Sequence, residues 1–249
     1  MNNTPALRQA KIDLTAALRL AAFMGLHEGI CNHFSLAVPT ESGEEAFLIN
    51  PQGIHWSDMR PADLVVVDVD GNKLDGVQNV EPTAFFIHGQ VHKAKKNAKC
   101  IMHTHMPYAT ALTLLEDGGL EWVSQNSLRY YGRVAYDTHY GGLALDPEEG
   151  SRICSKLENA EVLFMANHGV MLTGPTISNV FDDMYYLERA CMVQILAQST
   201  GKKLRQVSED VARSTAAQFE QERQQSTMHF DAMKKMLDRT SPGWSDMPE

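Results

Sequence analysis

The spacing of apolar residues along the chain predicts a mixture of helices and strands. Apolar side chains recur at helical spacing over residues 5–26 and over the longer segment 177–199, so both are expected to form helices. Short apolar runs bounded by proline, glycine or asparagine predict strands. The expected strands are 34–38, 46–49, 64–69, 99–103, 134–136, 162–165 and 170–172, with a further strand-rich stretch at Trp122–Val123.

Four more segments are expected to be helical. They are 83–97, 107–115, a helix that begins with Asp146 and Pro147 and runs to Leu157, and a more polar helix over 208–237. Because strands and helices alternate irregularly, an α/β fold is expected, with three α/β/α layers around a mainly antiparallel or mixed sheet. The prediction is one domain over residues 1–249, with a core at about 8–205 and a C-terminal helical tail at 206–249.

The composition of the chain restricts which partners and which cellular compartment are expected. The chain has 249 residues, 43% of them hydrophobic, and a formal net charge of -9, which argues against non-specific nucleic-acid binding. Charged residues interrupt the N-terminal segment, so no secretory signal is expected, and no apolar stretch is long enough for a membrane span. The four cysteines form no CxxC pair and fit a reducing compartment. We therefore expect a cytoplasmic protein with a small-molecule partner, neither nucleic acid nor membrane.

Three histidines form a candidate metal site. His103 and His105 flank one residue at the end of an expected strand, so their side chains share a face, and His168 precedes a glycine that permits close backbone approach. Three neutral imidazoles on one side of a divalent ion leave positions open for water or substrate, as in catalytic sites. An isolated His-x-His is also common among ordinary polar residues, so only the two motifs together carry the prediction.

The sequence around these histidines resembles the class II aldolase/adducin superfamily over about residues 10–200. The motifs that carry the resemblance are His103-Thr-His105-Met-Pro-Tyr-Ala, Asn167-His168-Gly169-Val-Met-Leu-Thr-Gly174, Tyr186-Leu-Glu188-Arg-Ala-Cys191 and Leu48-Ile-Asn-Pro-Gln-Gly53. The resemblance implies an α/β/α fold, often a tetramer with active sites at subunit interfaces. It also implies one divalent metal per subunit on His103, His105 and His168, for which we expect Zn²⁺, with Mn²⁺ or Fe²⁺ as alternatives.

The chain differs from the sugar-phosphate aldolases of this superfamily in two parts of the expected site, the first phosphate loop and the acid/base residue. Their first phosphate loop, Gly-Asn-x-Ser-x-Arg, is matched by a stretch with His33 in place of the asparagine and Ala37 in place of the arginine. Counting back from His88 places Ala84 where the aldolases have their acid/base glutamate. Alanine cannot abstract a proton, and a phosphate dianion favours the missing arginine. A sugar-phosphate aldolase is therefore not expected.

The resemblance and the residue types together nominate further site residues. The predicted catalytic residues are His88, His33 and Tyr131, and the predicted substrate-binding residues are Asn50, Gly53, Ser35 and Thr83. His88 and His92 lie four residues apart and share a helix face, where each has the alternative of a hydrogen-bonded packing role, the role favoured for His92. Tyr131 is a candidate general acid, with a core position as its alternative.

A retained metal site without the aldolase glutamate favours a metal-dependent carbon–carbon lyase. The expected reaction is decarboxylation, ahead of aldolase-type cleavage, of a small unphosphorylated keto or hydroxy(aromatic) acid. Two alternatives stay open: a non-catalytic, adducin-like interaction module, and an iron-dependent oxygenase on the same scaffold. An interaction module has no need of an open metal face, and oxygen uptake with Fe²⁺ separates an oxygenase from a lyase.

Overall fold

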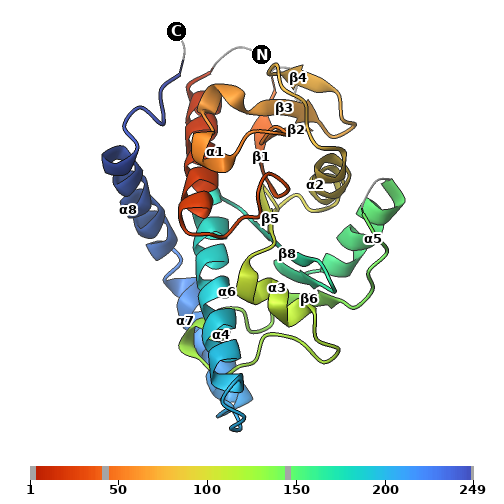
Figure 1. Ribbon diagram of the computed structural model, residues 1–249, viewed down its shortest axis with the longest axis vertical. Helices are drawn as coiled ribbons and strands as arrows, with labels where there is room; N and C mark the ends of the chain where they lie inside the picture. Colours follow the sequence, from red (N-terminus) through yellow and green to blue (C-terminus); the bar gives the residue numbers. More distant parts are fainter. Residues whose placement is uncertain (1–3, 41–44, 144–146, 248–249) are drawn as a thin grey trace.

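A mixed sheet forms the centre of the computed structural model, which describes residues 4–40, 45–143 and 147–247 (Figure 1). The strand order is β4-β3-β2-β1-β5-β8-β7-β6, and the neighbours are antiparallel except for the parallel pair β6 and β7. The strands are β1 (His33–Pro39), β2 (Glu45–Ile49), β3 (Val65–Asp68), β4 (Lys73–Asp75), β5 (Cys100–Thr104), β6 (Val134–Asp137), β7 (Val162–Met165) and β8 (Gly169–Gly174). The predicted mixed α/β/α architecture is confirmed.

Helices cover both faces of this sheet (Figure 1). One face packs against α1 (Pro5–Phe23), α3 (Pro107–Thr113), α6 (Ile177–Gln198) and α8 (Gln225–Thr240). The other face packs against α2 (Pro82–Ala94) and α5 (Pro147–Leu157). The short α4 (Gln125–Leu128) and α7 (Glu209–Gln221) contact each other beside α6, and two 3₁₀ turns, Trp56–Asp58 and Pro61–Asp63, lie against α1. None of the described helices is long and apolar enough to cross a membrane.

The alternation of side chains along β1 and β5 decides which residues can form a site. Phe34 and Met102 belong to the large core under α1 and α6. Since neighbouring strand residues point to opposite faces, His33 and Ser35 on β1 and His103 on β5 point toward α2. The register pairs His33 directly with His103, which places the two imidazoles side by side on that face.

Two expected elements differ from the structure. Trp122–Val123 is not a strand; it leads into Ser124, whose hydroxyl accepts a hydrogen bond from the Ser127 N–H and caps α4. The helix expected over 208–237 is two helices, α7 and α8, with a break between residues 221 and 225. At this break the Arg223 guanidinium donates two hydrogen bonds, of 2.8 and 2.9 Å, to the buried carboxylate of Asp183. Asp146, the expected cap of α5, lies outside the described residues.

Candidate metal centre

The structure brings the three predicted metal ligands together at one end of β5 and β8. His103 lies near the end of β5, His105 follows that strand, and His168 lies in the turn between β7 and β8. The ring centroids are 5.0 Å apart for His103 and His105, 4.8 Å for His103 and His168, and 4.9 Å for His105 and His168. One ligand atom of each ring lies within 4.8 Å of the others. Two separate segments, the end of β5 and the β7–β8 turn, thus form one imidazole face, which we call the histidine triad.

Hydrogen bonds at Nδ1 orient two of these rings. His103 Nδ1 donates to the Val170 carbonyl oxygen at 2.9 Å, and His105 Nδ1 lies 2.5 Å from the Glu28 carboxylate. His105 Nε2 is buried and has no hydrogen-bond partner among the described residues. Metal-binding histidines commonly donate their other ring N–H to a carboxylate or a carbonyl in this way. The donor set and the orphaned nitrogen therefore fit a divalent metal ion.

The backbone around the triad requires its glycine. A Cβ atom on Gly169 would lie 2.6 Å from the Thr104 carbonyl oxygen and 2.7 Å from His105 Cδ2. Asn167, two residues before, adopts a left-handed φ of 57°. The close approach of β8 to the end of β5 therefore sets the position of His168 against His105. On the other side, the Glu188 carboxylate accepts hydrogen bonds from two N–H groups at the start of α3, both at 2.9 Å, and so fixes the helix that follows His105.

Two rings of the triad, His103 and His168, favour the neutral form. Burial lowers the pKa of His103 well below its ordinary value, and the neighbouring His168 and His33 lower it further. Burial also lowers the pKa of His168 to about 4, with a smaller contribution from His105. A neutral imidazole is the form that donates a lone pair to a metal, so the site does not need to release protons from these two rings at neutral pH.

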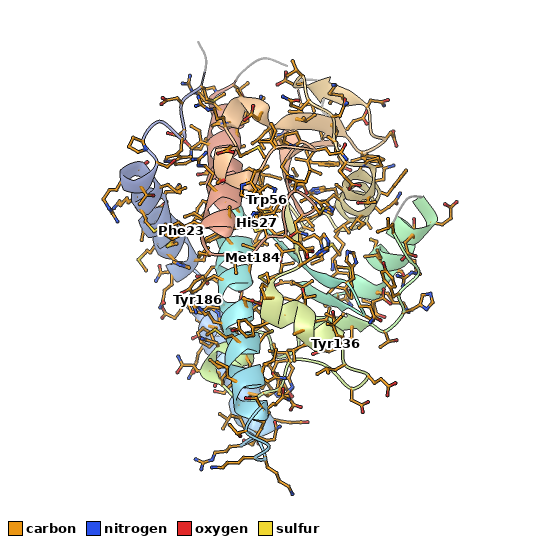
Figure 2. All side chains as sticks on the ribbon, in the orientation of Figure 1. Phe23, His27, Trp56, Tyr136, Met184 and Tyr186 are labelled. Carbon is orange, nitrogen blue, oxygen red and sulfur yellow. The ribbon has the colours of Figure 1, made fainter. Side chains whose placement is uncertain are left out.

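Glu28, which sequence reasoning missed, lies on a segment that is fixed by aromatic packing. The neighbouring His27 ring stacks on the buried Trp56 ring at a centroid distance of 5.3 Å (Figure 2). Asn32 continues this segment, and its side-chain oxygen accepts hydrogen bonds from the N–H groups of Glu28 and His105 at 2.8 and 3.3 Å. No local spacing in the sequence connects Glu28 with a histidine 77 residues away.

A second group of imidazoles lies next to the triad, deeper under α2. His33 Nδ1 is hydrogen bonded to His88 Nε2 at 3.0 Å, and the Ser35 hydroxyl bridges His88 Nδ1 at 2.6 Å and His92 Nε2 at 2.8 Å. We call His33, His88, Ser35 and His92 the buried chain. It meets the triad at His33, whose ring centroid lies 4.9 Å from that of His103. At its other end the His92 ring stacks on Phe47 at 4.6 Å.

The remaining predicted substrate residues surround this end of the sheet in different ways. Asn50 is buried, and its side chain accepts a hydrogen bond from the Phe34 N–H at 2.8 Å and donates one to the Asn32 carbonyl at 3.2 Å. Gly53 lies in an exposed turn with a φ of 86°. The Thr83 hydroxyl donates to the Glu81 carboxylate at the start of α2. Asn50 thus braces the backbone beside the triad, whereas Ser35 belongs to the buried chain.

Ala84 lies where the aldolase glutamate was expected, and its surroundings are apolar. It is 1% exposed and packs with side chains of β2 and β3, namely Phe47, Ile49, Val65 and Val67. Ala84, His88 and His92 follow each other at four-residue spacing and so share one stripe of α2. The nearby Glu81 carboxylate caps the helix by accepting from the Ala84 N–H at 2.9 Å. The stripe that faces the sheet therefore carries imidazoles and a methyl group in place of a carboxylate.

Tyr131 is not brought to the triad within one chain. It precedes β6, and its ring packs on Trp122 at 5.2 Å. Since β6 and β7 are parallel, the start of β6 lies at the opposite end of the pair from the turn that carries His168. Among the described tyrosines, Tyr140 approaches the triad instead: its ring lies 6.4 Å from the His168 ring, and it is outside every motif used for prediction.

Comparison with known proteins agrees with this geometry. The profile of the Class II Aldolase and Adducin N-terminal domain matches residues 12–195, and the chain belongs to this superfamily. A putative aldolase class 2 protein of Caulobacter vibrioides is 34% identical over 247 residues, covering 96% of this chain and 92% of the relative. Decarboxylase NovR of Streptomyces niveus is 28% identical over 205 residues, covering 82% of this chain and 74% of that protein.

Solved structures show the same fold. The crystal structure of an aldolase II superfamily protein from Pseudomonas syringae superposes with a TM-score of 0.88 at 31% identity, covering 98% of this chain and 97% of that chain. L-fuculose 1-phosphate aldolase from Glaciozyma antarctica superposes with a TM-score of 0.82 at 26% identity, covering 96% and 95%. The similarity thus extends over nearly the whole chain in both structures.

Proposed function

We propose that this protein is a divalent-metal-dependent carbon–carbon lyase that acts on a small unphosphorylated keto or hydroxy(aromatic) acid, with decarboxylation favoured over aldol cleavage. One observation carries the proposal: the triad presents an orphaned His105 Nε2, while the helix stripe beside it has Ala84 in place of a carboxylate. Membership of the superfamily supports lyase chemistry, and similarity to a protein named a decarboxylase supports the preferred reaction.

The triad and the residues beside it have different proposed roles in the reaction. His103, His105 and His168 would hold the metal, for which Zn²⁺ is the first proposal. A bound ion would supply Lewis acidity, which stabilises negative charge on a substrate when a carbon–carbon bond breaks. His33 lies against the triad and is placed to hold or move a proton at its ring nitrogen, in place of the absent carboxylate. Burial and the neighbouring imidazoles lower the pKa of His33 to about 3, so this ring is neutral at pH 7.

The same site is poorly suited to a sugar phosphate. A phosphate dianion needs cationic or N–H donors, and the position that supplies an arginine in the aldolases is Ala37. The proton abstraction in those enzymes needs a carboxylate that Ala84 lacks. When a substrate carboxylate leaves as CO₂, the electron pair of the broken carbon–carbon bond stays on the rest of the substrate. This step therefore needs no base to remove a proton from carbon. The two departures therefore point to the same class of substrate.

The experiment is a metal assay coupled to a CO₂-release screen. The purified protein is stripped with EDTA, loaded with Zn²⁺, Mn²⁺ or Fe²⁺, and offered α-keto and hydroxyaromatic acids, with aldehyde release and oxygen uptake recorded in parallel. We expect CO₂ release that EDTA abolishes and metal restores, and that is absent in His105→Ala but present in the control His139→Ala, whose histidine is exposed. Oxygen consumption with Fe²⁺ would favour the oxygenase. A protein that binds no metal would refute the lyase and favour the interaction module.

Assembly bears on Tyr131. The superfamily resemblance leads us to propose a homotetramer in the cytoplasm with active sites between subunits, and a tyrosine remote from its own triad is then available to the site of a neighbouring copy. Light scattering of the purified protein tests this directly. A monomer with full lyase activity would remove Tyr131 from the set of catalytic residues.

A further inference from the structure

His27 and His55 form a pair of imidazoles that belongs to neither the triad nor the buried chain. Their Nε2 atoms lie 3.2 Å apart at an exposed position, and their ring centroids are 5.0 Å apart. The centroids of His103 and His105 in the triad have the same separation of 5.0 Å. The two rings, each with one nitrogen close to the other, are therefore spaced to share an ion, as the rings of the triad are proposed to do.

The distance between the two nitrogens fits coordination of one ion. Zinc binds imidazole nitrogen at about 2.0–2.1 Å with tetrahedral angles, so two such nitrogens on one ion lie about 3.3–3.4 Å apart. The observed 3.2 Å is close to this spacing. The same distance also suits an N–H···N hydrogen bond, which is the form that the pair takes when no ion is bound. An ion would thus replace one shared proton without moving either ring far.

Each ring is held by a neighbouring side chain. The His27 ring stacks on the buried Trp56 ring at a centroid distance of 5.3 Å (Figure 2), and His55 Nδ1 lies 2.6 Å from the Ser57 hydroxyl oxygen. When His55 Nδ1 carries the proton of its ring, it donates to Ser57 and leaves a free lone pair on Nε2, as in many metal-binding histidines. His27 Nδ1 makes no hydrogen bond with the described residues, so no such contact fixes the tautomer of that ring.

The pair joins two segments that are distant in the sequence. His27 lies between α1 and Glu28, whose carboxylate contacts His105, and His55 caps the 3₁₀ turn Trp56–Asp58. Among the described residues, only the triad brings three or more histidine, cysteine or acidic side chains close enough to hold one ion. The pair therefore supplies two protein ligands, and water must complete the coordination. An exposed site with two nitrogens is expected to release its ion more readily than the triad.

We propose that His27 and His55 form a second, exchangeable binding site for a divalent transition metal ion such as Zn²⁺. The ion would bridge the segment after α1 and the 3₁₀ turn that His55 caps. Burial and the neighbouring His55 lower the pKa of His27, which favours the neutral form that binds a metal. The site does not depend on the proposed lyase activity, and its ion is additional to the one that the triad retains.

The experiment counts bound ions as the concentration of free Zn²⁺ rises. EDTA-treated protein is dialysed against each concentration, and mass spectrometry of the digested protein gives the ions bound per chain. His27→Gln and His55→Gln each remove one ligand of the pair, and His105→Ala removes one ligand of the triad. The matched controls are His139→Gln, which removes another exposed histidine, and Cys31→Ser, which removes an exposed thiol that can itself bind zinc.

The wild type and both controls should bind a second ion at the higher concentrations of Zn²⁺ and lose it when the excess is removed. His27→Gln and His55→Gln should stay at one ion over the same range, whereas His105→Ala should lose the tightly bound ion and keep the exchangeable one. A second ion that persists in both pair variants, or that is absent from the wild type, would overturn the proposal. Because His55 is exposed, His55→Gln decides alone if His27→Gln does not fold. Failure of the triad is seen separately, as loss of the tight step.

Discussion

Two groups of histidines lie against each other at one end of the sheet, and they differ in how their ring nitrogens are hydrogen bonded. In the triad, Nδ1 of His103 and of His105 is anchored, and the buried Nε2 of His105 has no partner among the described residues. In the buried chain, His33 Nδ1, both ring nitrogens of His88 and His92 Nε2 are hydrogen bonded to one another or to Ser35. The pairing of ring nitrogens thus distinguishes the candidate metal site from the buried hydrogen-bond network beside it.

The same contrast explains why α2 changes character along its length. The resemblance to the aldolases of this superfamily places their glutamate at the position of Ala84. In this chain, the same stripe of α2 continues with His88 and His92. With a methyl group at that position, the stripe contacts the apolar β2 and β3 side chains at one end and the polar chain at the other. Under the proposed function, the proton-handling group is His33 on β1 and not a residue of α2. Three tests follow, from the largest expected effect to the smallest.

Restoring the glutamate should break the packing instead of restoring an aldolase. Ala84→Glu places a carboxylate among the apolar side chains of β2 and β3, so the free energy of unfolding should fall by about 3 kcal/mol. Ala94→Glu, at the exposed end of the same helix, should change it by less than about 1 kcal/mol. Urea unfolding measures both. A stable Ala84→Glu protein that cleaves a sugar phosphate would contradict the packing of Ala84 among apolar side chains.

Removing the charge that orients His105 should weaken metal binding without unfolding the protein. Glu28→Gln leaves a neutral group beside His105 Nδ1, and loss of such a partner typically costs about 10- to 100-fold in metal affinity. The matched control is Glu222→Gln, which lies after α7 and away from the triad. Competition with a fluorescent zinc chelator gives the affinities. Equal metal affinities for the wild type and Glu28→Gln would show that Glu28 does not contribute to metal binding.

The buried chain should show itself in the pH dependence of stability. The pKa of His92 is about 4 in the folded protein and 6.5 ordinarily, so between these values the unfolded chain binds more protons and stability falls as the pH is lowered. From pH 6.5 to pH 5, this one group should account for a loss of about 2 kcal/mol. Urea unfolding of the EDTA-treated protein should therefore show a smaller loss in His92→Phe than in the wild type. Equal losses would mean that His92 is not held neutral.

The features that the sequence predicted are those that depend on short spacings. His103 and His105 share a strand end, and His168 is next to a glycine whose close approach the structure requires, so the triad was predictable from local patterns. The face shared by His88 and His92 was equally local. Their partner Ser35 lies 53 and 57 residues away, a relation that no periodicity encodes.

The errors have the same origin. The apolar pair Trp122–Val123 was too short to distinguish a strand from a loop that leads into a capped turn of helix. The break between α7 and α8 is associated with Arg223 reaching Asp183, 40 residues away. Both features depend on which residues tertiary packing brings together, whereas the periodic signals report only how one segment presents its side chains.

The most direct test of the contrast between the two histidine groups is metal stoichiometry in matched variants. After EDTA treatment, loading with Zn²⁺ and removal of the excess, mass spectrometry of the digested protein gives the ions bound per chain. The prediction is one ion per chain in the wild type and in Ser35→Ala, and none in His105→Ala. An ion retained by His105→Ala, or no ion in the wild type, would contradict the assignment of the triad as the metal centre.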